Sequence, residues 1–251
     1  MKMKVRRHNV SAVPGAMSNA AELEATMPSH GVGAAALLQL GMPSRLRAAV
    51  ARARSRLTGL WVITGSEIAE TLAMLAGEIG ATHAPQLDDR GSVNAALDAA
   101  ERGIVLAGAA GGDAIQSILM LRRLASDRFA LAAMLRLLVA QRVAPGLCGA
   151  CRRPEQAYGS VAALLGLDPG AILWAAPGCE ACGGTGSTGR VRVFEGVEID
   201  SAMRRLIYDG ADAPLLARHA FLNTPNLASA ARRLAREGLI APDEAVRISR
   251  S

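Results

Sequence analysis

The chain has 251 residues, of which 51% are hydrophobic and 3% aromatic, which is enough for one or two domains with an aliphatic core. No uncharged apolar run reaches the roughly 18 residues of a transmembrane helix, and the charged N-terminus lacks the apolar stretch of a signal peptide, so we expect a cytoplasmic protein with no transmembrane segment. The net charge of +6 comes almost entirely from arginine and no basic run is interleaved with aromatics, so we expect no nucleic-acid partner; an anionic membrane face or an acidic partner remains open.

Residues 33–144 alternate predicted strands with predicted helices, which favours a parallel sheet with crossover helices. Residues 1–32, which precede them, lack a sustained period, and we expect a linker or the remnant of a preceding domain. The elements predicted from apolar periodicity are a helical stretch over residues 34–57 interrupted at 41–43, a strand at 60–64, a helix over 68–79, a helix over 92–101, a strand at 104–106, a helix lined by Ile115, Ile118 and Leu119, and a helix lined by Leu131, Met134, Leu135 and Leu138.

Residues 145–251 are predicted to form a separate subdomain with a zinc-binding turn followed by helices. Asp200 and Pro242 are residues that commonly start helices. The predicted elements here are a helix at residues 161–165, a strand at 190–195, and helices at 201–209, 212–220, 227–238 and 242–249.

All four cysteines of the chain fall into two identical pairs, Cys148-x-x-Cys151 and Cys179-x-x-Cys182. Two such pairs supply four thiolates for a tetrahedral ion, so the spacing predicts a closed structural zinc site. Two redox dithiols, or cysteines that are simply buried, are the alternatives. A redox pair usually opens a helix, whereas the second pair here lies in a glycine-rich turn, which favours zinc.

The segment from Cys179 to Glu195 resembles the C-terminal signature of the secretion ATPases of type II secretion and type IV pilus assembly. That signature combines a cysteine pair, a glycine-rich turn ending in Gly-Arg, and a strand that ends in glutamate. Residues 138–143, Leu-Val-Ala-Gln-Arg-Val, match the motif before the family's first cysteine pair, and residues 85–103 resemble a further conserved stretch. The likeness spans roughly residues 34–249. The glycines of residues 184–189 also fit a dinucleotide fingerprint, but no strand comes directly before them and no helix follows, so they are interpreted as turn residues.

The resemblance implies a P-loop ATPase domain in a hexameric ring that drives pilin or pseudopilin assembly. A P-loop needs glycines around the phosphates, a lysine for the β- and γ-oxygens and a hydroxyl for magnesium. After the strand at residues 60–64, only Gly65 and Thr71 match this pattern, no lysine lies near, and Glu67 and Glu70 place negative charge where phosphates would bind. The predicted nucleotide site is therefore degenerate.

The second catalytic element of the family also departs from the pattern. Gln86 falls at the position of the catalytic glutamate and cannot act as a general base. Asp88 falls at the arginine position, Pro85 at the glycine position and Ala110 at the histidine position. Roughly 20 residues separate Gly65 from Gln86, so the acidic stretch between the two elements is missing. We expect no catalytic residues and no bound ATP.

These observations predict an α/β fold, with a degenerate P-loop (RecA-like) parallel sheet flanked by helices and followed by a four-cysteine zinc-binding, helical C-terminal subdomain. The predicted function is that of a hydrolysis-inactive interaction or regulatory subunit of a type II secretion or type IV pilus machine. Its expected partners are an active ATPase of that machine, inner-membrane platform proteins or further copies of itself, in the cytoplasm or peripherally at the inner membrane. An active motor subunit and a zinc-ribbon nucleic-acid binder remain the alternatives.

Overall fold

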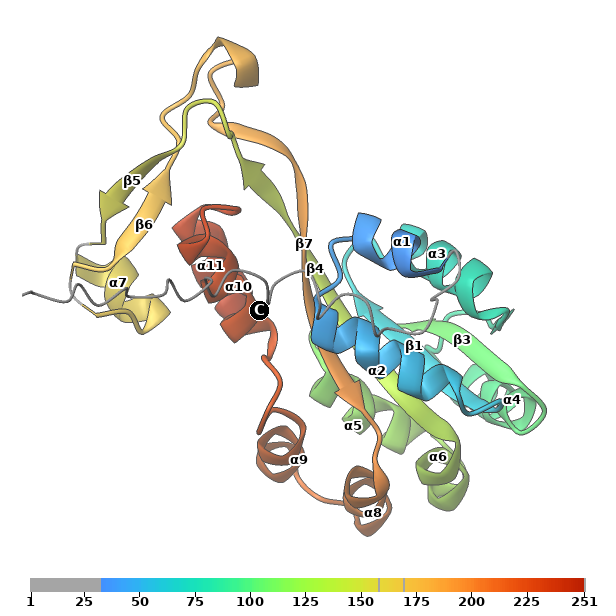
Figure 1. Cartoon of the computed structure of the whole chain (residues 1–251). Coiled ribbons are helices and arrows are strands. Elements are labelled where there is room, and N and C mark those ends of the chain that lie inside the picture. The colour runs from blue at the N-terminus through green and yellow to red at the C-terminus, as the bar shows by residue number, and fades with distance from the viewer. Residues whose placement is uncertain (1–32, 158, 169, 251) are drawn as a thin grey trace, which may run out of the picture. The chain divides into compact units, whose positions relative to one another are not determined.

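The computed structural model describes residues 33–157, 159–168 and 170–250 (Figure 1). The predicted linker or domain remnant, residues 1–32, lies outside the described residues. Within the described part, no helix combines the length and the apolar character needed to cross a membrane.

A five-stranded, mostly parallel sheet forms the centre of the described chain. The central strand β1 pairs in parallel with β3 on one side and β4 on the other, and β7 closes the sheet antiparallel to β4. The strands in spatial order are β2 (Thr82–His83), β3 (Ile104–Ala109), β1 (Gly59–Gly65), β4 (Leu135–Leu147) and β7 (Ser187–Glu198). The predicted strands at residues 60–64, 104–106 and 190–195 are confirmed.

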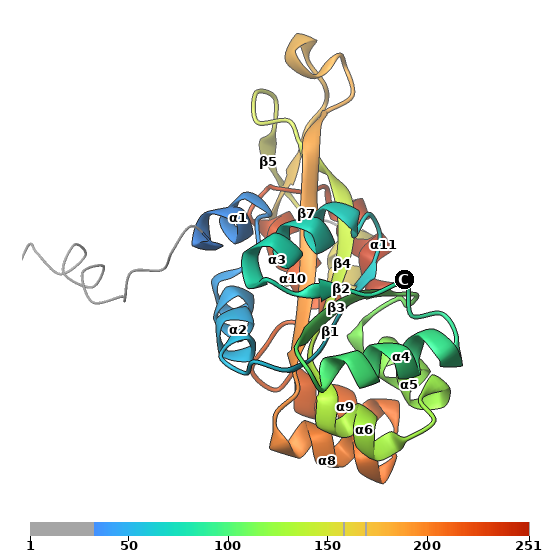
Figure 2. The same cartoon turned by 90° about the vertical axis from the view of Figure 1, so that its right-hand side faces the viewer.

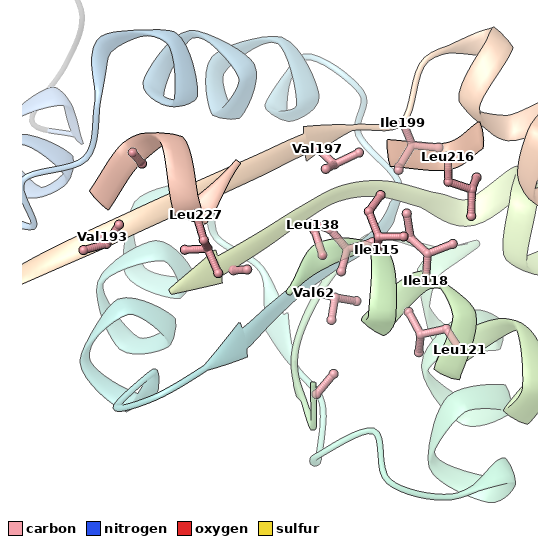
Figure 3. Packing of buried hydrophobic residues seen from close by; sticks show 14 of the residues in the cluster. Val62, Ile115, Ile118, Leu121, Leu138, Val193, Val197, Ile199, Leu216 and Leu227 are labelled. Atoms are coloured by element: carbon pink, nitrogen blue, oxygen red, sulfur yellow. The ribbon is translucent and has the colours of Figure 1, made fainter. Parts of the chain in front are cut away.

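Helices cover both faces of this sheet because successive strand residues point to opposite sides. In β1, Trp61 and Ile63 pack with α1 (Gly33–Gln39), α2 (Ser44–Arg54) and α3 (Ala69–Ile79). Leu60 and Val62 face the larger cluster on the other side, part of which is drawn in Figure 3. The helices contributing to that cluster are α4 (Arg90–Ala100), α5 (Ala114–Leu124), α6 (Arg128–Met134), α7 (Gly159–Leu165), α8 (Ser201–Asp209), α9 (Ala213–Ala220), α10 (Leu227–Arg236) and α11 (Pro242–Ser249).

Side-chain caps fix where many of these helices begin. The carboxylate of Asp200 accepts a hydrogen bond from the backbone N–H of Met203 at 2.7 Å, and Pro242 is the first residue of α11. Each side-chain cap of the kind made by Asp200 stabilises its helix by about 1 kcal/mol, because it satisfies an amide that has no partner within the helix. Both predicted helix starts are confirmed. The residues that cap in this way are Asp89, Asp113, Asp127, Asp200, Asp212 and Asn226.

The predicted helix through Leu131, Met134, Leu135 and Leu138 is wrong in its second half. The helix α6 ends at Met134, and strand β4 begins at Leu135. Leu138 and Ala140 pack on one face of the sheet and Leu137 and Val139 on the other. A strand buried on both faces has a continuous apolar sequence, and such a run cannot be told from a buried helix by its period.

Besides the two-residue strand β2, two further strands were not predicted from the sequence. They are β5 (Arg153–Gln156) and β6 (Ile172–Ala175), which pair antiparallel in a separate two-stranded sheet. The β5 segment is exposed and contains a proline, so its sequence carries no strand pattern. Strand β4 itself runs across residues 144 and 145, the predicted domain boundary.

Candidate metal centre and candidate nucleotide site

The four cysteines lie together where β4 ends and β7 begins. The two strands extend beyond the rest of the sheet, and the turns after β4 and before β7 carry the cysteine pairs (Figure 1). All four Sγ atoms lie within 4.8 Å of one another, with Cys148 to Cys179 at 3.9 Å and Cys179 to Cys182 at 3.8 Å. A tetrahedron with metal–sulfur bonds of about 2.3 Å has sulfur–sulfur edges of about 3.8 Å. The cluster predicted from spacing is confirmed, and it can hold a metal ion.

Backbone amides prepare one of these sulfurs for a cation. The N–H groups of Cys179 and Gly186 each donate to the Sγ of Cys182 at 3.2 Å. These bonds, led by the one from Cys179, lower the pKa of the Cys182 thiol to about 6. Removal from water raises the pKa of Cys151 to about 12. Binding of a metal ion by all four thiolates would therefore release protons and depend on pH.

The segment between β4 and β7 that carries the cysteines, called the cysteine arm, is tied to the C-terminal helices. The guanidinium of Arg152 lies 5.2 Å from the ring centroid of Trp174 and donates to the carbonyl of Gly238 at 2.6 Å. The indole N–H of Trp174 donates to the carbonyl of Arg236 at 3.1 Å. These contacts hold β6 and the first cysteine turn against the end of α10.

The loop after β1 is held closed by Gln141 of the neighbouring strand β4. Its side-chain amide donates to the carbonyls of Ser66 at 3.0 Å and Glu67 at 3.1 Å. In a phosphate-binding loop the backbone N–H groups converge on the ligand. Here two carbonyl groups converge on a donor instead, so the loop presents the opposite polarity at this point.

Both residues that match the P-loop pattern also contact Gln141. Thr71 is fully buried, and its hydroxyl donates to the Oε1 of Gln141 at 2.5 Å. Gly65 has a φ of +112°, and a side chain there would overlap the carbonyl of Gln141. Gln141 itself was not predicted as a site residue. The available hint is that it is the one uncharged polar residue of β4.

The two acidic residues of this segment are paired with arginines. Glu67 forms an ion pair with Arg190, and Glu70 forms one with Arg192. Both arginines come from β7, so the negative charge expected at the phosphate position is offset from across the sheet. Among the described residues Glu67 is the one non-glycine residue with a positive φ, of 54°, a left-handed conformation that costs roughly 1–2 kcal/mol.

Gln86 is exposed and lies just beyond β2. Its side chain lies against β3, because a Cβ added at Gly108 would overlap the Oε1 of Gln86. Beside it, the hydroxyl of Thr64 donates to the carbonyl of Gly111 at 3.2 Å. The end of β3 is thus packed against Gln86, which follows β2, and the end of β1 contacts Gly111, which follows β3.

A buried glutamate, Glu195, joins β7 to two helices. Its side chain is 2% exposed, and its carboxylate accepts from the N–H of Ala114 at 2.9 Å and of Leu227 at 2.8 Å. These are the first residues of α5 and α10, whose N-termini carry partial positive charge. Burial raises the pKa of Glu195, although both amide bonds act in the opposite direction.

We expect Gln141→Leu to lower the free energy of unfolding by about 2–4 kcal/mol. The change leaves two loop carbonyls and the buried Thr71 hydroxyl without their partner, and an unsatisfied buried group costs about 1–3 kcal/mol. Urea denaturation followed by circular dichroism measures this. Gln116→Leu, at an exposed position on α5, is the matched control and should stay within about 0.5 kcal/mol of the original chain. Equal stability of the two variants would contradict the role given to Gln141.

Solved structures share the fold of the described chain. The ATPase DotB of Yersinia pseudotuberculosis superposes with a TM-score of 0.57 at 14% identity, covering 85% of this chain and 62% of that one. The pilus retraction motor PilT with bound ADP gives a TM-score of 0.54 at 17% identity, covering 83% of this chain and 65% of that one. The described chain therefore has the α/β fold of these ATPases, with a four-cysteine arm on its last two long strands.

The family follows from the sequence comparisons. A model of the Type II/IV secretion system protein family matches residues 86–247, and the chain belongs to this family. Type II secretion system protein E of Pseudomonas aeruginosa is 33% identical over 168 residues, which are 66% of this chain and 34% of the relative. Type IV pilus assembly ATPase PilB of Myxococcus xanthus is 30% identical over 113 residues, 43% of this chain and 20% of the relative. The matched part of this chain thus spans 34% and 20% of the length of these two relatives.

Proposed function

We propose that this chain is a hydrolysis-inactive member of the secretion and pilus ATPase family that acts as an interaction or regulatory subunit. The observation that carries the proposal is the closed loop after β1. Gln141 takes up the carbonyls of Ser66 and Glu67 and the hydroxyl of Thr71, and the loop contains no lysine. Binding of a nucleoside triphosphate would require Gln141 to release these groups and the loop to turn its backbone N–H groups toward the phosphates.

Electrostatics support the same conclusion. A P-loop offsets the charge of a triphosphate with a lysine, a magnesium ion and aligned amide dipoles. Two cations near the loop, Arg190 and Arg192, are already paired with Glu67 and Glu70, so phosphate would have to displace a carboxylate from each. The guanidinium of Arg142 lies beside Gly65, where its Nη1 donates to the carbonyl of Gln141 at 3.1 Å. Gln86 at the catalytic position adds no base, and base catalysis typically contributes about 10²–10⁴ in rate.

We further propose that Cys148, Cys151, Cys179 and Cys182 bind one zinc ion. Four thiolates at tetrahedral spacing suit zinc, which when bound would cross-link the two turns and leave no open position for catalysis. The site therefore has a structural role in the proposal.

The retained fold supports a role beside active members of the family. In this proposal the chain joins an active secretion or pilus ATPase, further copies of itself in a hexameric ring, or the inner-membrane platform of such a machine. It would work on the cytoplasmic side, peripherally at the inner membrane. The relatives named for type II secretion and type IV pilus assembly support these two settings.

The test is a nucleotide assay on purified protein loaded with zinc. We expect no phosphate release from magnesium-ATP above the buffer rate and no binding heat at millimolar nucleotide. Gln86→Glu should restore nothing, because binding fails before chemistry. A Gln141→Ala variant, in which the loop is freed, should also fail to hydrolyse ATP because the lysine is still absent. Tight ATP binding, or hydrolysis that Thr71→Ala abolishes, would overturn the proposal.

A further inference from the structure

Three arginines converge where β1 and β4 begin, at the ends of these strands remote from the closed loop. They are Arg56, just before β1, Arg136 on β4, and Arg204 on α8. Arg136 packs beside the start of β1, because a Cβ added at Gly59 would overlap its Cγ. Burial is the main cause that lowers the pKa of Arg136, and the positive charges of Arg56 and Arg204 add to it.

None of the three arginines has an ion-pair partner among the residues the structure describes. Arg136 is held in place by its Nη1, which donates to the carbonyls of Ala133 and Leu135. Its Nε is shielded from solvent and has no hydrogen-bond partner. Like charges gathered without a counter-charge cost free energy, which an anionic partner would recover.

The carboxylates on the neighbouring elements are already engaged. Asp209 pairs with Arg205 at 3.4 Å, and Asp200 contacts His219 at 3.1 Å. Asp127 caps α6 through the N–H of Phe129. The convergent arginines are therefore not neutralised by acids of these elements.

An apolar groove adjoins the arginines, between α6 and α8, which lie side by side in both views (Figures 1 and 2). Its volume is about 710 Å³, and its lining includes Phe129, Ala133, Arg204 and Tyr208. The rings of Phe129 and Tyr208 meet edge to face with centroids 6.4 Å apart, yet the residues are 67% and 51% exposed. Leu57, next to Arg56, is 83% exposed. Exposed aromatics beside arginines are typical of the centre of a protein interface.

We propose that this surface, formed by Arg56, Leu57, Phe129, Arg136, Arg204 and Tyr208, binds an acidic segment of another protein. Carboxylates of the partner would face the guanidinium groups, whose planar forks suit bidentate pairing. An apolar side chain of the partner would enter the groove. The proposal rests on the role of interaction subunit given above and adds the place and chemistry of the contact.

Charge and shape favour this occupant over two others. A second copy of the chain also carries a net charge of +6, which opposes close approach of the same faces. A flat anionic bilayer presents headgroups and would not place an apolar side chain in the groove between the two helices. An acidic peptide segment fits both the arginines and the groove.

The test measures binding of a fluorescent 15-residue peptide, three repeats of Glu-Glu-Leu-Glu-Phe, by polarisation at low salt. We expect Arg56→Ser combined with Arg204→Ser to weaken binding at least tenfold, and Phe129→Ser combined with Tyr208→Ser to weaken it severalfold. The matched control, Arg90→Ser with Arg102→Ser, removes two exposed arginines near α4 that also lack ion pairs and should bind as the original chain does. Melting curves establish that every variant is folded.

Further probes separate the outcomes. A peptide with glutamine in place of glutamate should not bind, and loss of affinity with added salt should be smaller for the arginine variant. Equal affinity of all variants, or binding to phosphatidylglycerol vesicles without binding to the peptide, would overturn the inference. If the arginine variant still co-purifies with secretion or pilus proteins as the original chain does, this surface is refuted while the interaction role itself stands.

Discussion

Replacing Cys148 with serine is expected to unfold the region from about residue 145 to 195 and to abolish stoichiometric zinc binding. The four sulfurs already lie at tetrahedral spacing, so a bound ion would add four bonds between two turns that the hydrogen bond from the N–H of Cys148 to the carbonyl of Gly186 also joins. Apparent binding energies of four-thiolate sites are on the order of 10 kcal/mol, and that energy is also folding energy. Elemental analysis and thermal melting measure the two effects.

The control is Glu180→Gln, which changes an exposed residue between two of the ligands and should keep both the zinc and the melting temperature. A strong chelator should lower the melting temperature of the original chain and leave that of Cys148→Ser unaffected. Purified protein without zinc, or a serine variant that melts unchanged, would contradict the structural role of the site.

Glu195→Ala is expected to lower the free energy of unfolding by about 3–5 kcal/mol. The carboxylate is buried and accepts from the first amides of α5 and α10. Its removal leaves two buried N–H groups unsatisfied, each costing about 1–3 kcal/mol, in addition to a cavity. The matched control is Glu198→Ala on the same strand, where a partly exposed ion pair with Arg52 is lost and the expected cost is below about 1 kcal/mol.

The raised pKa of Glu195 predicts the pH dependence of this contribution. The folded protein holds the proton more tightly than the unfolded chain, whose glutamate pKa is about 4.3. The contribution is therefore fully present below that value and is lost as the pH rises through the raised pKa of the folded state. The stability of the original chain relative to Glu195→Gln, which cannot titrate, should fall as the pH is raised from about 4 to 7. A difference that grows over that range would show that the pKa is lowered instead.

Features encoded over a few residues could be predicted from the sequence. The spacing of the cysteines predicts their cluster, and capping residues such as Asp200 predict where helices begin. The strand β4 could not be recognised, because burial on both faces removes the alternation that distinguishes a strand from a helix. The family resemblance identified Glu195 as the end of a strand. It could not identify the hydrogen-bond partners of Glu195, since Ala114 lies 81 positions away.

The closed loop after β1 shows the same limit of prediction from the sequence. Gly65 and Thr71 could be singled out from the motif, but whether they face a phosphate depends on Gln141, which is 70 positions from Thr71. Likewise, Glu67 and Glu70 are acidic in sequence, yet their charges are offset by arginines more than 120 positions later. Local patterns identify candidate groups, whereas the sheet pairing decides what those groups meet.

The length of β4 has a consequence for how the chain can be divided. Its residues from Leu137 to Leu147 pair with β7, so one ladder of hydrogen bonds runs from the parallel sheet to the cysteine turns. A fragment ending at residue 144 would leave this apolar strand as an unpaired edge, which is a template for aggregation. The parallel sheet and the cysteine arm would therefore act as folding partners of each other, so the local unfolding expected for Cys148→Ser should also weaken the parallel sheet.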